Sequence, residues 1–126
     1  MADSSTKPGT ITLEEQDGCS VVRLDGEHDL TTAREIRAAL LRQAEQRDVI
    51  VDLSATTFLD SAALQALFLG RRRTVEEHGH HFVLQLGDAL AVQQVLEITG
   101  FLQLFDHART RDEALAKVLT GESQDG

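Results

Sequence analysis

Apolar residues along this chain recur first at strand spacing and then at helical spacing, and the change falls near the middle of the sequence. The run Val49–Leu53 is apolar and β-branched, which predicts a buried strand. Ser54–Thr57 breaks the run, and Phe58–Leu59 returns the chain to apolar surroundings. Helical spacing then links Leu64, Leu67, Phe68 and Val75. Asp60 and Ser61 therefore stand where a helix begins, a position that favours both residue types.

The segment before Val49 predicts a hairpin and a helix. Two strand-like segments, 11–13 and 20–24, flank Asp17-Gly18, a dipeptide typical of tight hairpin turns. An apolar helical face follows, made of Ala33, Ile36, Leu40 and Ala44. We expect Thr31 or Thr32 to cap this helix, with Glu35 in capping-box spacing after Thr32.

The segment after Val75 again predicts strands that alternate with helices. Gly79 ends the second helix, and the run 81–86 predicts a strand. Asp88 is then expected to cap a helix that ends at Gly100. Residues 101–105 predict a last short strand or extended segment. Thr110 and Glu113 have capping-box spacing and predict a final helix whose buried residues are Ala114, Leu115, Val118 and Leu119.

This order of elements predicts an α/β fold. Strands that alternate with helices at short spacing imply right-handed parallel crossovers after the first hairpin. We therefore expect a mixed sheet, antiparallel at its N-terminal hairpin and parallel elsewhere, with about four helices mainly on one face. A chain of 126 residues fits one domain, at 10–120, with a disordered lead at 1–9 and a disordered tail at 121–126.

Composition narrows the function classes. The formal charge of −9 argues against a direct nucleic-acid surface, because such surfaces need a basic stripe. The one basic run, Arg71–Arg73, is followed by Glu76-Glu77 and reads as a solvated helix face. No stretch has the length of a membrane span, and the N-terminus lacks a secretory signal. A single cysteine, Cys19, is expected to be a semi-buried small hydrophobe in a cytoplasmic protein.

The sequence contains two candidate sites of other kinds. His78, His80 and His81 cluster, but adjacent residues in an extended segment point to opposite sides, so an exposed turn is favoured over a metal site. Ser61 as an enzyme nucleophile lacks the Gly-x-Ser-x-Gly elbow and a nearby histidine. The sequence therefore predicts no metal, no cofactor and no enzymatic activity.

Ser61 has two chemical interpretations. The free N–H groups and the dipole of a helix N-terminus favour negative charge there. A hydroxyl at that position is either a passive helix cap or the acceptor of a phosphoryl group.

A motif around Ser61 carries a family resemblance. Asp52-Leu53-Ser54, followed by Phe58-Leu59-Asp60-Ser61-Ala62-Ala63-Leu64, resembles the signature of STAS-domain anti-sigma factor antagonists. In that family the serine after the aspartate is phosphorylated by a partner that is both kinase and anti-sigma factor, which implies this role for Ser61. Ala63 stands where the family usually has glycine, and the added methyl bears on any close approach of a partner. Gly26-Glu27-His28-Asp29 also resembles a family loop, with His28 in place of an aliphatic residue.

The resemblance implies a phosphorylation-gated protein switch. The unmodified protein would bind its kinase/anti-sigma partner and so release a sigma factor, and a separate serine phosphatase would reset it. The partner-binding residues implied are Asp29, Thr57, Asp60, Ser61, Ala62, Ala63 and Leu64. Asp29 has an alternative role as a plain turn residue. The alternative for the whole chain is an unphosphorylated STAS module of a transporter or a larger signalling assembly. We expect a monomer or a weak dimer.

Overall fold

The computed structural model describes residues 8–121, and the predicted disordered segments lie largely outside them. Pro8 and Gly9 are described, and an isolated bridge pairs Pro8 with Glu27. The elements, in chain order, are β1 (Thr10–Gln16), β2 (Cys19–His28), α1 (Leu30–Ala44), β3 (Val49–Asp52), β4 (Thr56–Leu59), α2 (Ser61–Arg71), η1 (Arg72–Glu77), β5 (Phe82–Gln85), α3 (Leu90–Ile98), η2 (Phe101–Leu104), β6 (Asp106–Ala108) and α4 (Arg111–Thr120).

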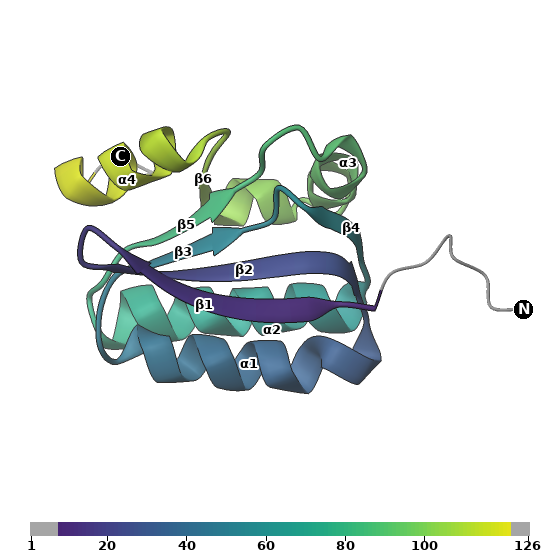
Figure 1. Ribbon diagram of the computed structural model, residues 1–126, viewed down its shortest axis with the longest axis horizontal. Helices are drawn as coiled ribbons and strands as arrows, with labels where there is room; N and C mark the ends of the chain where they lie inside the picture. The colour runs from purple at the N-terminus through teal and green to yellow at the C-terminus, as the bar shows by residue number, and fades with distance from the viewer. Residues whose placement is uncertain (1–7, 122–126) are drawn as a thin grey trace, which may run out of the picture.

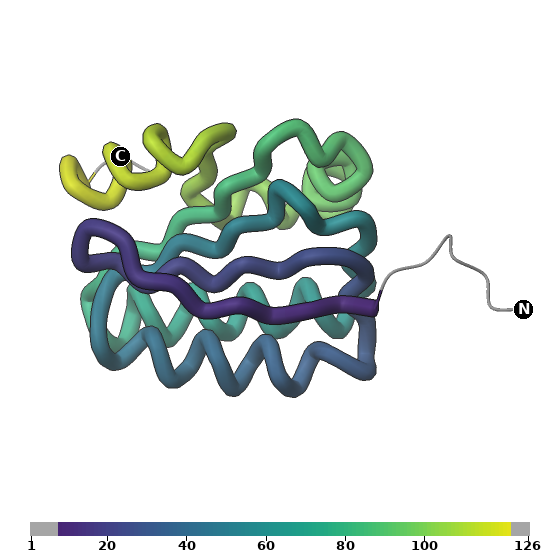
Figure 2. Tube along the Cα trace, viewed as in Figure 1, coloured from purple at the N-terminus to yellow at the C-terminus, as the bar shows by residue number. Residues whose placement is uncertain are grey.

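The predicted mixed sheet is confirmed, with strand order β1-β2-β3-β5-β6 and β4 paired to the end of β2 (Figure 1). The β1–β2 pair is antiparallel and the other pairs are parallel. The turn between β1 and β2 falls at Asp17 and Gly18, whose φ angles are 51° and 82° (Figure 2). Positive φ at both positions is what a tight turn between twisted strands needs, so the hairpin prediction is confirmed.

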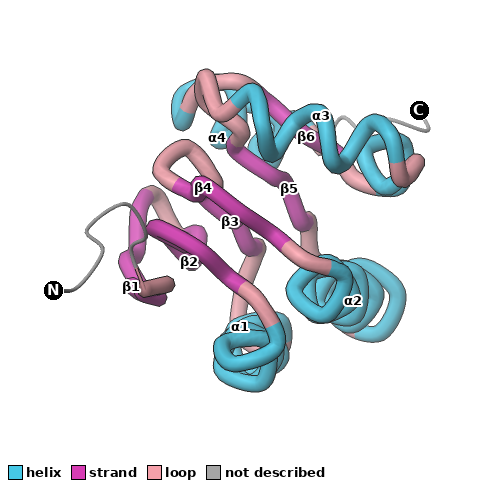
Figure 3. The backbone as a smooth tube through the Cα atoms, turned by 90° about the vertical axis from the view of Figure 1, so that its right-hand side faces the viewer, coloured by secondary structure: helices cyan, strands magenta, loops and turns pink. Residues whose placement is uncertain are grey.

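The core has two layers because neighbouring residues of a strand face opposite sides. Val22 and Leu24 of β2 face α1, α2 and α3, in a core that also includes Val51. Val21 and Ile50 face the other way, into a smaller core closed by α4 (Figure 3). The helices therefore lie mainly on one face, as the sequence predicts, and α4 alone covers part of the opposite face.

Four local predictions were wrong. Leu119, which was expected to be buried in the last helix, keeps 73% of its surface exposed. The first helix is capped by Asp29 rather than by Thr31 or Thr32, because the Asp29 carboxylate accepts the Thr31 N–H. Asp88 does not cap α3, because its carboxylate is paired with Arg109 at 2.7 Å. The run 101–105 forms a short 3-10 helix, and the last strand follows it, since short apolar runs fit a buried helix or a strand equally well.

Other local predictions hold. Thr110 and Glu113 form the predicted capping box at the start of α4. Gly79 takes the left-handed conformation, with φ 70°, after η1. The last turns of the second helix widen into a π-helix, where the Thr74 hydroxyl donates to the Gly70 carbonyl at 2.7 Å. Cys19 is more fully buried than expected, with 2% of its surface exposed.

Candidate functional site

Two helix N-termini meet at the end of the sheet where β2 and β4 stop. These strands run parallel, and His28 of β2 pairs with Leu59 of β4. Parallel strands that end together deliver the residues after them to one place, here Asp29 and Asp60. Each of these aspartates then caps the helix that it precedes, α1 or α2. Figure 3 looks onto this end and shows the two helices side by side.

The Asp60 carboxylate is shared between both helices. Its Oδ1 accepts the N–H of Ala63, 3.0 Å away, which is the capping bond of α2. Its Oδ2 accepts the N–H of Leu30, the first residue of α1, at 3.1 Å. The backbone N–H of Asp60 also donates to the carbonyl of His28 at 3.1 Å. Asp60 therefore fixes the position of one helix start relative to the other, a role that no local sequence pattern indicates.

Ser61 is the first residue of α2 and lies exposed beside this carboxylate. Because Asp60 supplies the cap, Ser61 is not the passive cap that the sequence allowed. Within the described part of the chain, the Ser61 side chain makes no hydrogen bond. Its hydroxyl is therefore open to a partner, and it stands at the positive end of the α2 dipole.

The other predicted partner-binding residues divide by exposure. Thr57 is exposed on β4, and Ala62 is half-buried in the first turn of α2. Ala63 and Leu64 are buried in the core between α2 and the sheet, at 0% and 4% exposure. The methyl group of Ala63 therefore points into the protein rather than toward a partner.

Asp29 caps α1, and the capping hydrogen bonds change its pKa. Its Oδ1 accepts hydrogen bonds from the Thr31 hydroxyl at 2.5 Å and the Thr31 N–H at 2.9 Å. These two bonds lower the pKa of Asp29 below its ordinary value, and the bond from the Thr31 hydroxyl has the larger effect. Asp29 is therefore ionised at neutral pH and adds negative charge at the end of the sheet where Ser61 lies.

Two apolar side chains that no sequence pattern marked as functional are exposed at this end. Leu30, at the start of α1, is 76% exposed, and Phe58, on β4, is 47% exposed. Exposed large apolar groups beside polar ones are typical of protein-binding surfaces. We use the name switch face for the exposed residues Leu30, Thr57, Phe58 and Ser61 at this end of the sheet.

His28 lies under this end and is fully buried. Its Nε2 lies 3.0 Å from the carbonyl of Asp25, which can only accept, so Nε2 carries the proton. In the neutral ring Nδ1 then accepts from the Thr32 hydroxyl at 3.1 Å. Burial lowers the pKa of His28 from its ordinary value, against the opposing effect of the hydrogen bond to Asp25. The neutral ring is thus a satisfied core group.

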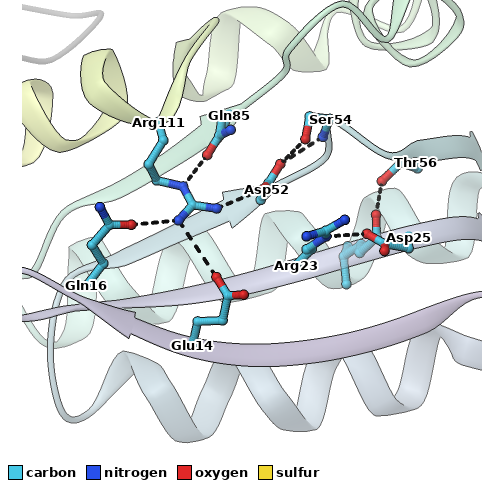
Figure 4. Close-up of polar contacts among 10 residues, drawn as sticks. Glu14, Gln16, Arg23, Asp25, Asp52, Ser54, Thr56, Gln85 and Arg111 are labelled. Carbon is cyan, nitrogen blue, oxygen red and sulfur yellow. Dashed lines mark hydrogen bonds and ion pairs between the residues drawn. The ribbon is translucent and has the colours of Figure 1, made fainter.

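A second polar cluster lies on the face of the sheet that α4 partly covers (Figure 4). Arg111, the first residue of α4, donates to Asp52 at 2.8 Å, to Gln85 at 2.5 Å and to Gln16 at 2.8 Å. The other oxygen of Asp52 accepts the N–H and the hydroxyl of Ser54 at 2.9 and 2.6 Å. The Asp52-Leu53-Ser54 part of the motif therefore has a structural role, which is to anchor α4 and shape the loop after β3.

The histidine cluster has ordinary contacts. The rings of His78 and His80 stack with centroids 6.4 Å apart, and His80 Nδ1 lies 2.9 Å from the carbonyl of Ala44. Across residues 8–121, no three histidine, cysteine or acidic side chains gather as metal ligands would. In the same residues, no helix is long and apolar enough to cross a membrane.

Comparisons with known proteins agree with this architecture. BtrV of Bordetella bronchiseptica is 29% identical over 112 residues, covering 87% of this chain and 95% of that protein. The crystal structure of an anti-sigma factor antagonist from Mycobacterium paratuberculosis superposes with a TM-score of 0.74 at 31% identity, covering 88% of this chain and 94% of that chain. The Bacillus cell fate determinant SpoIIAA, in its phosphorylated form, shares the fold with a TM-score of 0.61 at 23% identity, covering 86% of this chain and 99% of that chain.

A sequence model of the STAS domain matches residues 10–114, a segment that runs from the first residue of β1 into α4. The match contains both helix starts, both capping aspartates and Ser61. Because it covers most of the chain, the protein belongs to the STAS domain family.

Proposed function

We propose that this protein is an anti-sigma factor antagonist whose binding to a kinase/anti-sigma partner is switched off by phosphorylation of Ser61. The observation that carries the proposal is the place of Ser61, exposed at the start of α2 and beside a cap that Asp60 already supplies. A relative of 31% identity is an anti-sigma factor antagonist, and a protein of the same fold has been solved in a phosphorylated form. Both likenesses support the proposal.

The physical logic of the switch is local. A phosphoryl group on Ser61 adds about −1.5 to −2 charges at pH 7. The N-terminus of α2 stabilises such a charge by about 0.3–1 kcal/mol, and the hydroxyl serves no structural purpose, so the fold survives. A partner surface adapted to a neutral hydroxyl loses affinity, because the phosphate brings charge and a desolvation cost into the contact. The ionised Asp29 suits a basic partner surface.

In this proposal the partner contacts the switch face and the first turn of α2. Thr57 and Ala62 contribute with Ser61, while Asp29 and Asp60 shape the helix starts. Ala63 and Leu64 act from beneath by holding the first turn of α2 in place. Release of a sigma factor follows from competition for the partner, and a serine phosphatase returns the protein to its binding state.

The test is to incubate the protein with ATP and its candidate kinase partner and to map the modified residue by mass spectrometry. We expect one phosphoryl group on Ser61. Ser61→Ala should remain unmodified yet bind the partner as the parent does, whereas Thr57→Ala, a matched change of the neighbouring exposed hydroxyl, should still be phosphorylated. Modification of another residue, or of none, would overturn the phosphorylation proposal and favour an unphosphorylated module of a larger assembly.

A binding measurement completes the test. Ser61→Asp should weaken partner binding at least about tenfold, with an unchanged circular dichroism spectrum, because a carboxylate at a helix start is well tolerated. Equal affinities of Ser61→Asp and the parent would show that charge at this position is not the switch.

A further inference from the structure

A cavity of about 760 Å³ opens between α3, the end of β6 and α4. Its apolar wall is formed by Leu86, Leu90, Leu102 and Ala116. Leu90 keeps 69% of its surface exposed. The volume lies in the range of about 300–1,000 Å³ that holds small organic ligands. An apolar body therefore fits this part of the protein.

The acidic side chains of the lining are already engaged. Asp88 forms an ion pair with Arg109, whose Nη2 and Nε donate to the same oxygen at 2.7 and 3.1 Å. Glu113 accepts the backbone N–H groups of Arg109 at 3.0 Å and Thr110 at 3.3 Å, as part of the capping box. Both carboxylates therefore already have hydrogen-bond partners within the protein, and the charge of Arg109 is already neutralised by Asp88.

The two remaining titratable side chains of the lining are both basic, and they lie near one another. His107 belongs to β6 and Lys117 to α4, and both line the cavity. Burial is the main cause that lowers the pKa of His107, and the charge of Lys117 lowers it further, against Asp106. An anion placed between the two would relieve this repulsion. Within residues 8–121, the Lys117 ammonium forms no ion pair of its own.

We propose that the cavity binds a small organic monoanion with an apolar chain, of the class of medium-chain monocarboxylates. The carboxylate contacts His107 and Lys117, and the chain lies against Leu90 and Leu102. A multiply charged phosphate ligand fits less well, because only these two basic groups are not already paired with a lining carboxylate. The proposal uses no residue of the switch face and stands independently of the switch function.

The test follows the imidazole NMR signals of the protein during addition of octanoate, with 1-octanol as the uncharged probe of equal chain length. The His107 signal is identified by its loss in His107→Gln. Octanoate should shift this signal and raise the pKa of His107, because the bound carboxylate stabilises the charged ring. The exposed ring of His78 should not respond.

Three variants locate the contact. Lys117→Gln should weaken octanoate binding about fivefold or more, since it removes the cation. Arg37→Gln, a loss of the same charge on the exposed side of α1, should leave the affinity unchanged. Ala116→Phe should abolish binding by filling the cavity, and its circular dichroism spectrum should match the parent because Ala116 is an exposed helical residue.

Each contrary result overturns a stated part of the proposal. Equal binding of 1-octanol and octanoate would overturn the assignment of an anion. A His107 signal that is unmoved by millimolar octanoate would overturn the site. Parent-like octanoate affinity in Lys117→Gln would place the ligand elsewhere. This conclusion would hold even if Ala116→Phe failed to fold.

Discussion

The carboxylate of Asp60 accepts the backbone N–H of Leu30 across a 3.1 Å hydrogen bond that joins two helices far apart in the sequence. The same carboxylate caps its own helix through Ala63. A single side chain therefore sets both the start of α2, where Ser61 lies, and its position against α1. Any change at Asp60 is expected to alter stability and the switch face together.

Asp60→Asn should lower the free energy of unfolding by about 1 kcal/mol, because the amide oxygen can keep the cap while the amide nitrogen cannot accept from Leu30. Asp60→Ala should cost about 2 kcal/mol, because both acceptors are lost. Urea denaturation measures both values. Equal costs for the two variants would show that the hydrogen bond to Leu30 contributes nothing.

Phe58→Ser should weaken binding of the kinase partner at least about tenfold, because exposed aromatic side chains commonly supply much of the affinity of an interface. The matched control is Leu119→Ser, which changes another exposed apolar residue, on α4 and far along the chain from the switch face. Calorimetric titration of both variants checks the prediction. Comparable losses in both would point to a general effect on the protein.

Breaking the Arg111–Asp52 pair should destabilise the protein by about 2 kcal/mol. A buried pair costs about 3–5 kcal/mol to break from one side, and we discount that figure because 23% of the Arg111 side chain is exposed. Asp52→Asn and Arg111→Gln, with the double variant, measure the coupling by urea denaturation.

The control for this pair is Asp88→Asn, which breaks the exposed pair with Arg109 and should change stability by less than about 0.5 kcal/mol. If the Asp52 and Arg111 variants lost no more than this control, the anchoring role of Arg111 would be wrong.

His28 should make the protein less stable as the pH falls. Burial lowers the pKa of His28 in the folded protein, while the unfolded chain titrates near pH 6.5. Between the two pKa values the unfolded chain binds a proton that the native state does not, so stability is lost as the pH falls below about 6.5.

His28→Gln keeps a donor for the Asp25 carbonyl but does not titrate. Its unfolding free energy should therefore fall less than that of the parent between about pH 7 and pH 5.5. The pKa of His107 is also lowered, so part of the pH dependence should persist. His78→Gln, at an exposed histidine, should behave as the parent does. A parent-like pH dependence in His28→Gln would count against the buried neutral ring.

Local pattern determined the order of the elements and the class of the sheet. The β-branched run from Val49 predicts a central strand, because burial on both faces selects such residues. Asp17-Gly18 predicts the hairpin, because the turn needs positive φ at both positions. The sequence also placed Ser61 at the start of a helix, since aspartate and serine both favour that position.

Tertiary structure alone decided which side chain does what at that position. Asp88 is drawn from the start of α3 to Arg109, because a competing partner arrives from a distant element. Asp60 meets Leu30 only because β2 and β4 end side by side. Short-range spacing carries no information about such contacts. The start of the switch helix could therefore be predicted from the sequence, but the fixed geometry that leaves Ser61 free could not.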